Sequence, residues 1–245
     1  KSSYANYSFM FGATNSNLDE IKKINKNEVA ALKIFLGSST GDMLVDNQQI
    51  LRDIFLSTDL IIVVHSEDEQ IINENLKKYK IKYNSNIPFD CHSKIRSEEA
   101  CLKSTKKIIK LAKETNARLH VFHLSTKLES LLFQNDIPLK EKKITSEVCV
   151  HHLWFSDKDY KDKQSFIKWN PAIKTEEDRD GLWDSLLDDR IDVIATDHAP
   201  HTLEEKSKPY LDCPSGGPLV QHALVSMIQH HLNNKISLEK IVTKM

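Results

Sequence analysis

The chain has 245 residues, enough for one large domain or two small ones, and its formal net charge of -1 gives no overall attraction to nucleic acid or anionic membranes. Its four cysteines form no Cys-x-x-Cys pair, so neither a zinc knuckle nor a disulfide framework is predicted. No apolar run approaches the roughly 18 residues of a membrane-spanning helix, and the first residue is Lys1 rather than methionine. We expect a cytoplasmic protein, cut from a longer chain, that binds neither nucleic acid nor membrane.

Short apolar runs alternate along the chain with longer amphipathic segments. Buried strands are expected at 7–11, 29–36, 60–64, 119–122, 144–150 and 191–195. Helices are expected at 18–24, 47–56, 97–114, 126–133, 176–187 and 218–231. Strands that alternate with helices predict right-handed βαβ units around a parallel sheet. Six such strands make up most of a (β/α)8 barrel but not all of it.

Polar residues interrupt or follow these apolar runs. Lys33 lies inside the run 30–36, where an unpaired ammonium would be costly to bury. His65 and His123 each close a run, and Asp197 follows the last run. The carboxyl ends of the strands carry the chemistry of α/β barrels, and these residue types suit a divalent metal ion. Because the four residues come from four different strands, a shared metal or catalytic site is the stronger interpretation.

Each of these residues also has a structural explanation when it is taken alone. A single histidine at a strand end is more often a hydrogen-bonded rim residue than a metal ligand. Lys33 could extend past its apolar neighbours to solvent. Asp197 could cap the turn at Pro200. The functional interpretation therefore depends on all four residues lying together.

Five segments of the sequence, taken together and in this order, resemble dihydroorotases of the amidohydrolase superfamily. They are Leu-Lys-Ile-Phe at 32–35, His-Ser-Glu-Asp at 65–68, His-Leu-Ser-Thr at 123–126, Glu-Val-Cys-Val-His-His-Leu at 147–153, and Asp-His-Ala-Pro-His-Thr-Leu-Glu-Glu-Lys at 197–206. The last segment is the specific one, since strand-end histidines are shared with hydantoinases and allantoinases. Lysine at position 33 is similar to the branch that carries a carboxylated lysine.

The resemblance implies a fold and an activity. The fold would be a (β/α)8 TIM barrel of the metal-dependent hydrolase type, incomplete, with about strands 3 to 8 present in a single partial domain over residues 1–245. The activity would be the zinc-dependent, reversible hydrolysis of dihydroorotate to N-carbamoyl-aspartate in de novo pyrimidine biosynthesis. The partner implied is this small-molecule substrate, and a homodimer is the expected assembly if the chain associates with itself.

The resemblance also implies a metal centre. Lys33, carboxylated by carbon dioxide or bicarbonate, would bridge two zinc ions. His65 and His123 would bind the second zinc, and Asp197 the first. Asp197 would in addition take the proton of the attacking hydroxide and pass it to the leaving ring nitrogen, as base and then acid.

Substrate contacts follow from the same resemblance. His201 would bind the substrate carboxylate, Asn170 would contact the substrate, and the loop residues Pro214, Ser215 and Gly216 would close over the pyrimidine ring. Turn chemistry explains Asn170 and the glycines of that loop equally well. Ser39 and Thr40 are candidates for a mobile lid.

Two further residues are candidates for supporting the metal ligands. Glu147 follows the family pattern of a glutamate near the metals in some members, and His151 is expected to support a ligand or to pack rather than to bind metal. Because successive strand residues point to opposite faces, at most one of His151 and His152 is expected to face the barrel interior. His92 and His120 show no partner pattern and are interpreted as structural.

The sequence also departs from the family pattern. The His-x-His pair and nearby arginine of the family's first strand occur nowhere in it, and its first strand resembles the family's third. We therefore expect an inactive fragment that binds fewer than two zinc ions. Two alternatives stay open, namely a hydantoinase- or allantoinase-like cyclic amidase and a catalytically inactive dihydroorotase-like scaffold subunit. The Asp-His-Ala-Pro-His segment favours dihydroorotate as the substrate.

Overall fold

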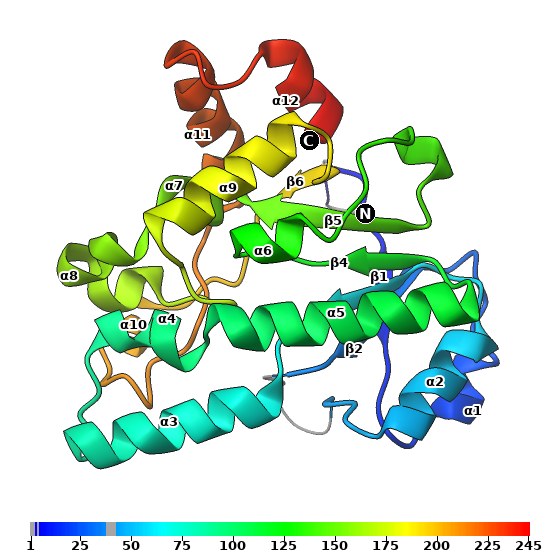
Figure 1. Ribbon diagram of the computed structural model, residues 1–245, viewed down its shortest axis with the longest axis horizontal. Helices are drawn as coiled ribbons and strands as arrows, with labels where there is room; N and C mark the ends of the chain where they lie inside the picture. Colours follow the sequence, from blue (N-terminus) through cyan, green and yellow to red (C-terminus); the bar gives the residue numbers. More distant parts are fainter. Residues whose placement is uncertain (1–2, 4, 38–42) are drawn as a thin grey trace.

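The computed structural model describes residues 3, 5–37 and 43–245, so the candidate lid residues Ser39 and Thr40 lie outside the described part. Six parallel strands form one sheet in which each strand pairs with the next one along the chain (Figure 1). They are β1 (Phe9–Gly12), β2 (Val29–Phe35), β3 (Ile62–His65), β4 (Leu119–Val121), β5 (Ile144–Cys149) and β6 (Val193–Ala195). The predicted parallel sheet and its six strands are confirmed.

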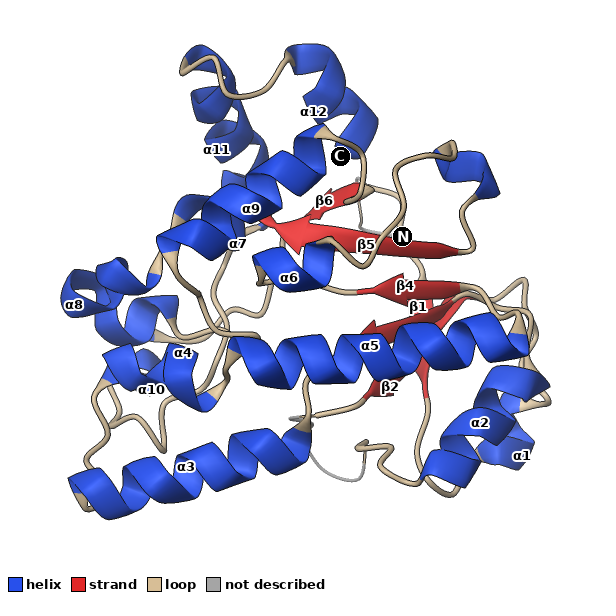
Figure 2. Ribbon diagram, viewed as in Figure 1, coloured by secondary structure: helices blue, strands red, loops and turns tan. Residues whose placement is uncertain are grey.

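In Figure 2 the sheet lies behind α5, α6 and α9, which cover one of its faces. The described helices follow or separate the strands along the chain. They are α1 (Leu18–Ile21), α2 (Gln48–Ser57), α3 (Glu69–Tyr83), α4 (His92–Ile95), α5 (Glu98–Thr115), α6 (Lys127–Ser130), α7 (Val150–Trp154), α8 (Tyr160–Lys163), α9 (Glu176–Leu187), α10 (Leu203–Lys206), α11 (Val220–Leu232) and α12 (Leu238–Lys244). The arrows of β4 and β5 point toward α4, α7 and α8. The carboxyl ends of these strands therefore face that side of the molecule.

Local sequence signals explain where the longer helices begin and end. The Ser97 side chain accepts a hydrogen bond from the Ala100 N–H at the start of α5, and Asn116 ends this helix in the left-handed conformation. Thr175 and Asp178 form a capping box at the start of α9, which begins and ends where the sequence predicted. These caps satisfy backbone groups that a helix end leaves unpaired.

The structure differs from several sequence-based expectations, including the following three. Helix α3 was not predicted, because Ile72 is its one buried residue among those described and its apolar periodicity is weak. Helix α6 spans only Lys127–Ser130 rather than 126–133. The last strand is regular only from Val193, because the Asp192 carboxylate bonds to the Ser146 N–H and to the Lys142 ammonium at its start.

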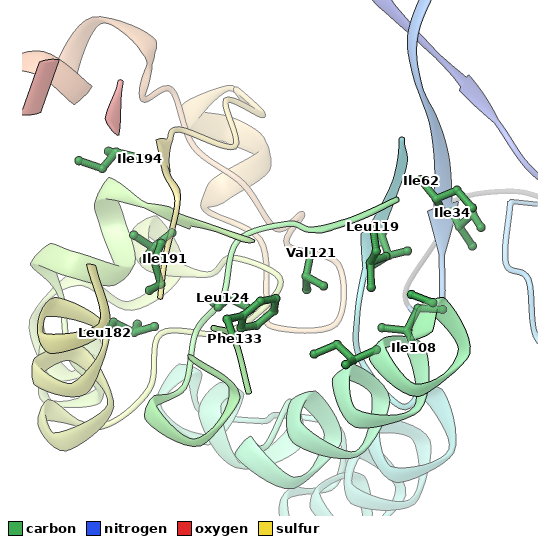
Figure 3. Close-up of a cluster of buried hydrophobic side chains, with 14 of the residues drawn as sticks. Ile34, Ile62, Ile108, Leu119, Val121, Leu124, Phe133, Leu182, Ile191 and Ile194 are labelled. Carbon is green, nitrogen blue, oxygen red and sulfur yellow. The ribbon is translucent and has the colours of Figure 1, made fainter. Parts of the chain in front are cut away.

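The outer face of the sheet forms the hydrophobic core against the helices. Because strand side chains alternate between faces, every second residue points to this side. Ile34, Ile62 and Val121 from neighbouring strands pack in one cluster with Ile108 of α5 and Phe133 (Figure 3). This apolar layer fixes the strands whose other face carries the polar residues.

The inner face of the sheet is polar and less deeply buried. Lys33 is in register with Val63, Val63 with His120, and His120 with Thr145, so these side chains belong to one layer. Among the described strands, β1 and β6 each pair on one side only. Met10 on β1 is 46% exposed, as expected for an open barrel whose interior is not fully enclosed.

Candidate active site

Two buried histidines face each other beyond the carboxyl ends of β3 and β4. His65 is the last residue of β3, and His123 follows β4 with a positive φ of 37°. His65 Nδ1 lies 3.1 Å from His123 Nε2, and the two rings meet edge to face. Burial lowers the pKa of both imidazoles below the usual value, so both rings are neutral at neutral pH. Neutral imidazoles have lone pairs that can bind a metal ion.

The separation of these two nitrogens fits a shared metal ion. Two imidazole nitrogens bound to one tetrahedral zinc, at about 2.0–2.1 Å each, lie roughly 3.3 Å apart. The observed 3.1 Å is close to this value. The His65–His123 pair therefore has the geometry of two ligands of one metal ion.

A buried ion pair holds His65 in the orientation that this geometry needs. Glu67 accepts a hydrogen bond from His65 Nε2 at 2.7 Å, and the Arg96 guanidinium pairs with the same carboxylate. Burial alone would raise the pKa of Glu67, but Arg96 and His65 outweigh it and hold that pKa well below the usual value. The carboxylate therefore keeps the hydrogen on Nε2 and leaves the lone pair of Nδ1 directed at His123.

Lys33 and Asp197 are the other two candidate metal ligands predicted from the sequence. Lys33 Nζ lies 4.0 Å from the ring centre of Phe122 and 4.7 Å from that of Phe35. Burial lowers the pKa of Lys33 to about 8, while Glu147 and Asp197 act to raise it. Burial raises the pKa of Asp197. Glu147 raises this pKa further, whereas Lys33 lowers it. These mutual effects place the Lys33 and Asp197 side chains in one electrostatic environment.

Asp197 and His123 share an unusual backbone conformation. Both follow a strand by two residues, and both have positive φ, 44° for Asp197 and 37° for His123. This conformation is uncommon for residues other than glycine and costs free energy. Strained residues of this kind often occur at functional sites, where a side chain must point in a direction that regular strand geometry does not allow.

Glu147 links the inner face of the sheet to the histidine pair. Its Oε1 accepts a hydrogen bond from the His123 backbone N–H at 3.3 Å, and its Oε2 lies 3.1 Å from His120 Nε2. The other nitrogen of His120 contacts the Thr145 hydroxyl at 2.8 Å. His120 is therefore the hydrogen-bond partner of Glu147, a role that the sequence pattern did not reveal.

The predicted substrate-contacting loops pack against each other. His201 Nε2 lies 3.2 Å from the carbonyl oxygen of Ser215, and the Ala199 N–H donates to the Gly217 carbonyl at 3.2 Å. Gly216 has φ of 133°, and a Cβ atom there would lie 2.4 Å from the Ala199 carbonyl oxygen. Glycine is required at this position because both the backbone conformation and the close approach exclude a side chain.

Lys206, in the Glu-Glu-Lys part of the motif, ties these loops together. Its buried ammonium donates to the carbonyl oxygens of Lys168 at 3.3 Å, Pro214 at 3.0 Å and Gly216 at 3.0 Å. Three accepting carbonyls satisfy all three N–H groups of the side chain. The motif therefore contains a structural cation as well as the candidate catalytic aspartate.

Asn170 lines a small cavity, and none of the four candidate metal ligands is among the residues that line it. The cavity has a volume of about 150 Å³, and Ser215, Arg96 and Lys168 also line it. Arg96 reaches the ion pair with Glu67 from this side. The Asn170 side-chain oxygen is buried without a hydrogen-bond partner among the described residues. The structure thus brings Asn170 and Ser215 together at a cavity with two basic residues.

The prediction for His151 and His152 was wrong in its premise. Strand β5 ends at Cys149, and both histidines lie in helix α7 rather than at successive strand positions. Both rings are buried, and their centres are 4.2 Å apart. The alternation of strand side chains therefore does not apply to them, and both point to the same region. They form a group with Cys149 in which the candidate ligand atoms lie within 4.8 Å of one another.

A larger groove of about 660 Å³ lies between α2 and α5, and Glu67, the partner of His65, is among the residues that line it. Its lining is mostly charged and polar and includes Arg52, Asp68, Lys107 and Glu114. No histidine or cysteine lines this groove among the described residues. The groove therefore lacks the histidines of the predicted metal centre.

Comparison with solved structures defines the fold class. The structure superimposes on L-hydantoinase (dihydropyrimidinase) from Arthrobacter aurescens with a TM-score of 0.87 and 23% identity, covering 98% of this chain and 55% of that one. A D-hydantoinase gives a TM-score of 0.85 at 18% identity, with 99% and 55% covered. The chain therefore has the fold of an incomplete (β/α)8 barrel of the hydantoinase type.

Sequence comparison identifies the proteins to which the chain is related. No family model matches the chain. It is 30% identical to the dihydroorotase of Halobacterium salinarum over 233 residues, which are 94% of this chain and 52% of that protein. It is 39% identical to the dihydroorotase of Latilactobacillus sakei over 139 residues, which are 56% of this chain and 32% of that protein. The chain is a relative of the dihydroorotases, and it spans about half the length of the curated relatives it matches.

The described helices also bear on the membrane prediction. None of them combines the length and the apolar character that crossing a bilayer requires.

Proposed function

We propose that this chain carries part of the active site of a dihydroorotase, a zinc-dependent cyclic amidohydrolase that reversibly hydrolyses dihydroorotate to N-carbamoyl-aspartate. One observation carries the proposal. In a chain related to dihydroorotases, His65 Nδ1 and His123 Nε2 face each other at 3.1 Å in the electrostatic environment of Lys33. The substrate would be a small molecule, and pyrimidine biosynthesis would be its pathway.

The proposed metal centre uses the four residues predicted from the sequence. Lys33, carboxylated by carbon dioxide, would bridge two zinc ions, with His65 and His123 on the second and Asp197 on the first. A lysine pKa of about 8 supports the carboxylation of Lys33. At pH 7 such a lysine is neutral in roughly a tenth of molecules, against roughly one in 2,500 for an ordinary lysine, and only the neutral amine reacts with carbon dioxide.

Carboxylation would also resolve an electrostatic conflict. A lysine ammonium beside Phe122 and Phe35 is poorly solvated, which is why burial lowers its pKa. The carbamate forms when the amine nitrogen bonds to the carbon of carbon dioxide and releases a proton. The product is an anion that a divalent cation neutralises, so the site would hold a metal instead of an unpaired ammonium.

Asp197 would move the proton in the reaction. Bound zinc would supply polarisation of the ring amide carbonyl and activation of water. Asp197 would accept the proton of the attacking water and deliver it to the leaving ring nitrogen. Its raised pKa supports this role, because a more basic carboxylate accepts a proton more readily. Glu147 would contribute by raising that pKa and by holding the His123 backbone.

Substrate binding would use the loops joined by Lys206. His201 and Asn170 would contact the substrate, and the backbone at Pro214, Ser215 and Gly216 would cover the ring. The cavity that Asn170 and Ser215 line also has Arg96 and Lys168 on its wall. Arg96 is paired with Glu67, and the Lys168 ammonium donates to the carbonyl oxygens of Tyr210 and Cys213, so the proposed substrate contacts are those of His201, Asn170 and the loop backbone.

A hydantoinase-like cyclic amidase is the second candidate. The fold similarity to L-hydantoinase, with a TM-score of 0.87, favours it as a related chemistry on the same barrel. A catalytically inactive scaffold is disfavoured, because it gives no physical reason to keep Lys33 buried next to His65 and His123. Assembly as a homodimer and a cytoplasmic location stay predictions.

The test is turnover by the complete open reading frame that encodes this chain. Purified protein loaded with zinc would be given dihydroorotate or hydantoin, and carbamoyl-aspartate or the opened hydantoin would be measured. Zinc-dependent formation of carbamoyl-aspartate is expected. Preferential hydrolysis of hydantoin would replace the proposal with the second candidate. A folded, zinc-loaded protein that opens neither ring would instead support the interpretation as a catalytically inactive scaffold subunit.

A further inference from the structure

A compact group of ligand-type side chains lies at the end of β5, outside the proposed metal centre. Cys149, His151 and His152 place their candidate ligand atoms within 4.8 Å of one another. Each of these residues is at most 2% exposed. Thiolate and imidazole are the ligands that zinc and related transition metals prefer.

The turn from strand to helix brings these three side chains together. Strand β5 ends at Cys149, and α7 begins at the next residue. His151 stacks on Trp169 with ring centres 4.4 Å apart, which fixes the plane of its imidazole. His152 Nε2 lies 3.1 Å from the carbonyl oxygen of Pro171, so this nitrogen carries the hydrogen. The lone pair of His152 is therefore on Nδ1.

Three ring nitrogens of His151 and His152 have no hydrogen-bond partner among the described residues. They are His152 Nδ1 and both ring nitrogens of His151, and all three are buried. Burying a polar group without a partner is unfavourable, and such groups call for an explanation. Burial holds the pKa of both histidines far below the usual value, to about 3 for His152, so the rings are neutral. Buried neutral imidazoles with free lone pairs are suited to a metal cation.

We propose that Cys149, His151 and His152 form a second metal site, with one thiolate and two imidazole ligands, that binds Zn²⁺. On binding, the Cys149 thiol loses its proton to solvent and its sulfur bonds to the metal. Burial raises the pKa of the Cys149 thiol, and Glu147 and Asp197 raise it further, so the thiol keeps its proton until a metal ion displaces it. The same two carboxylates would offset the remaining positive charge of the bound ion. Three protein ligands leave the fourth position for water. This site differs from the proposed catalytic centre, whose ligands Lys33, His65, His123 and Asp197 include no sulfur.

The sulfur ligand makes the experiment selective. The purified chain, freed of metal, would be titrated with Co²⁺, which gives a near-ultraviolet charge-transfer band only when a thiolate is bound. In parallel, X-ray absorption of the protein with one equivalent of Zn²⁺ would count sulfur neighbours. We expect the cobalt band and about one sulfur at about 2.3 Å from zinc.

Two substitutions identify the thiolate. Cys149→Ser should abolish the cobalt band. Cys91→Ser is the matched control, because Cys91 is also a buried free cysteine but packs in a different apolar cluster with Ile72 and Ile87. The control should keep the band. Circular dichroism would establish that both variants fold, and the X-ray absorption of the unmodified protein gives an answer even if Cys149→Ser does not.

Three results would overturn the proposal: zinc bound with nitrogen and oxygen neighbours alone, a cobalt band that survives in Cys149→Ser, or no metal at Cys149, with only ordered water against His151. None of them would refute the proposed dihydroorotase function, because its ligands contain no sulfur. Conversely, a protein without turnover that still shows the thiolate band would retain this site.

Discussion

The two faces of the sheet carry different kinds of residue. The outer face holds the apolar core that stabilises the fold, and the inner face holds the candidate site residues. Ile34 points to the outer face and is fully buried against the helices, whereas its neighbour Lys33 points inward, close to Phe122 and Phe35. Consecutive residues of one strand thus have different roles, one in the apolar core and the other in the candidate site. The stability of the apolar outer face offsets the cost of holding charged and strained groups on the inner face. Substitutions on the two faces should therefore change different measured quantities.

The largest expected effect is on the inner face. Asp197→Asn, made in the complete open reading frame, should lower kcat for dihydroorotate by about 10³-fold, because general acid–base groups typically contribute 10²- to 10⁴-fold. The free energy of unfolding should change by less than about 1 kcal/mol, because the amide removes a charge whose burial is unfavourable. Steady-state kinetics and urea denaturation measure the two quantities. A kcat within tenfold of the unmodified enzyme would remove Asp197 from the mechanism.

An outer-face substitution should show the opposite pattern. Ile34→Ala should lower the free energy of unfolding by about 2–5 kcal/mol, because it removes buried methyl groups and leaves a cavity. Val242→Ala is the control, since Val242 is 80% exposed and should change stability by less than about 0.5 kcal/mol. Urea denaturation compares them. Equal losses for both variants would contradict the assignment of the core to this face.

A third test uses a carboxyl group on the helix side of the sheet. Glu129 is buried and accepts hydrogen bonds from the hydroxyls of Thr105 and Thr126, and burial raises its pKa to about 7. Between about pH 4.5 and pH 7 the folded state therefore binds more protons than the unfolded state, and this group's contribution falls as pH rises, by up to about 3 kcal/mol.

Glu129→Gln should remove this part of the pH dependence. Glu67, whose pKa is held below its usual value, contributes stability that is lost only as pH falls toward acid, so it does not produce the same trend. Thermal denaturation of both proteins from pH 4.5 to pH 8 measures the difference. Parallel curves across this range would show that the Glu129 pKa is not raised.

The smallest expected effect concerns Glu67, which orients the His65 ring on the inner face. Glu67→Gln should weaken zinc binding at the His65–His123 pair by about 10- to 100-fold, because the amide holds the His65 ring less firmly. Glu74→Gln, on the exposed surface of α3, is the matched control and should leave affinity unchanged. Competition with a chromophoric chelator measures both. Unchanged affinity in Glu67→Gln would mean that the ion pair with Arg96 is purely structural.

Strand periodicity predicted most of the sheet and the residues at its carboxyl end. Lys33, His65, His123 and Asp197 stood out because a strand buried on both faces rarely carries such side chains. The structure brings these four residues into one environment. Their roles as ligands stay predictions.

The sequence did not reveal contacts between distant segments. Arg96 pairs with Glu67 from 29 positions away, and no local pattern predicts such a pair. A carboxylate two residues after a strand-end histidine was the available signal for Glu67. Helix α7 was missed because Val150 continues the apolar run of β5, and an apolar run alone does not distinguish a strand from a helical turn.

Lys206 offers a way to follow the loops in solution. Its ammonium is enclosed by three backbone carbonyls, from Lys168, Pro214 and Gly216. An amine-labelling reagent can therefore reach it only when these loops separate, whereas exposed lysines react at once. The labelling rate of this one lysine, read by mass spectrometry, reports the local opening equilibrium of the loops directly.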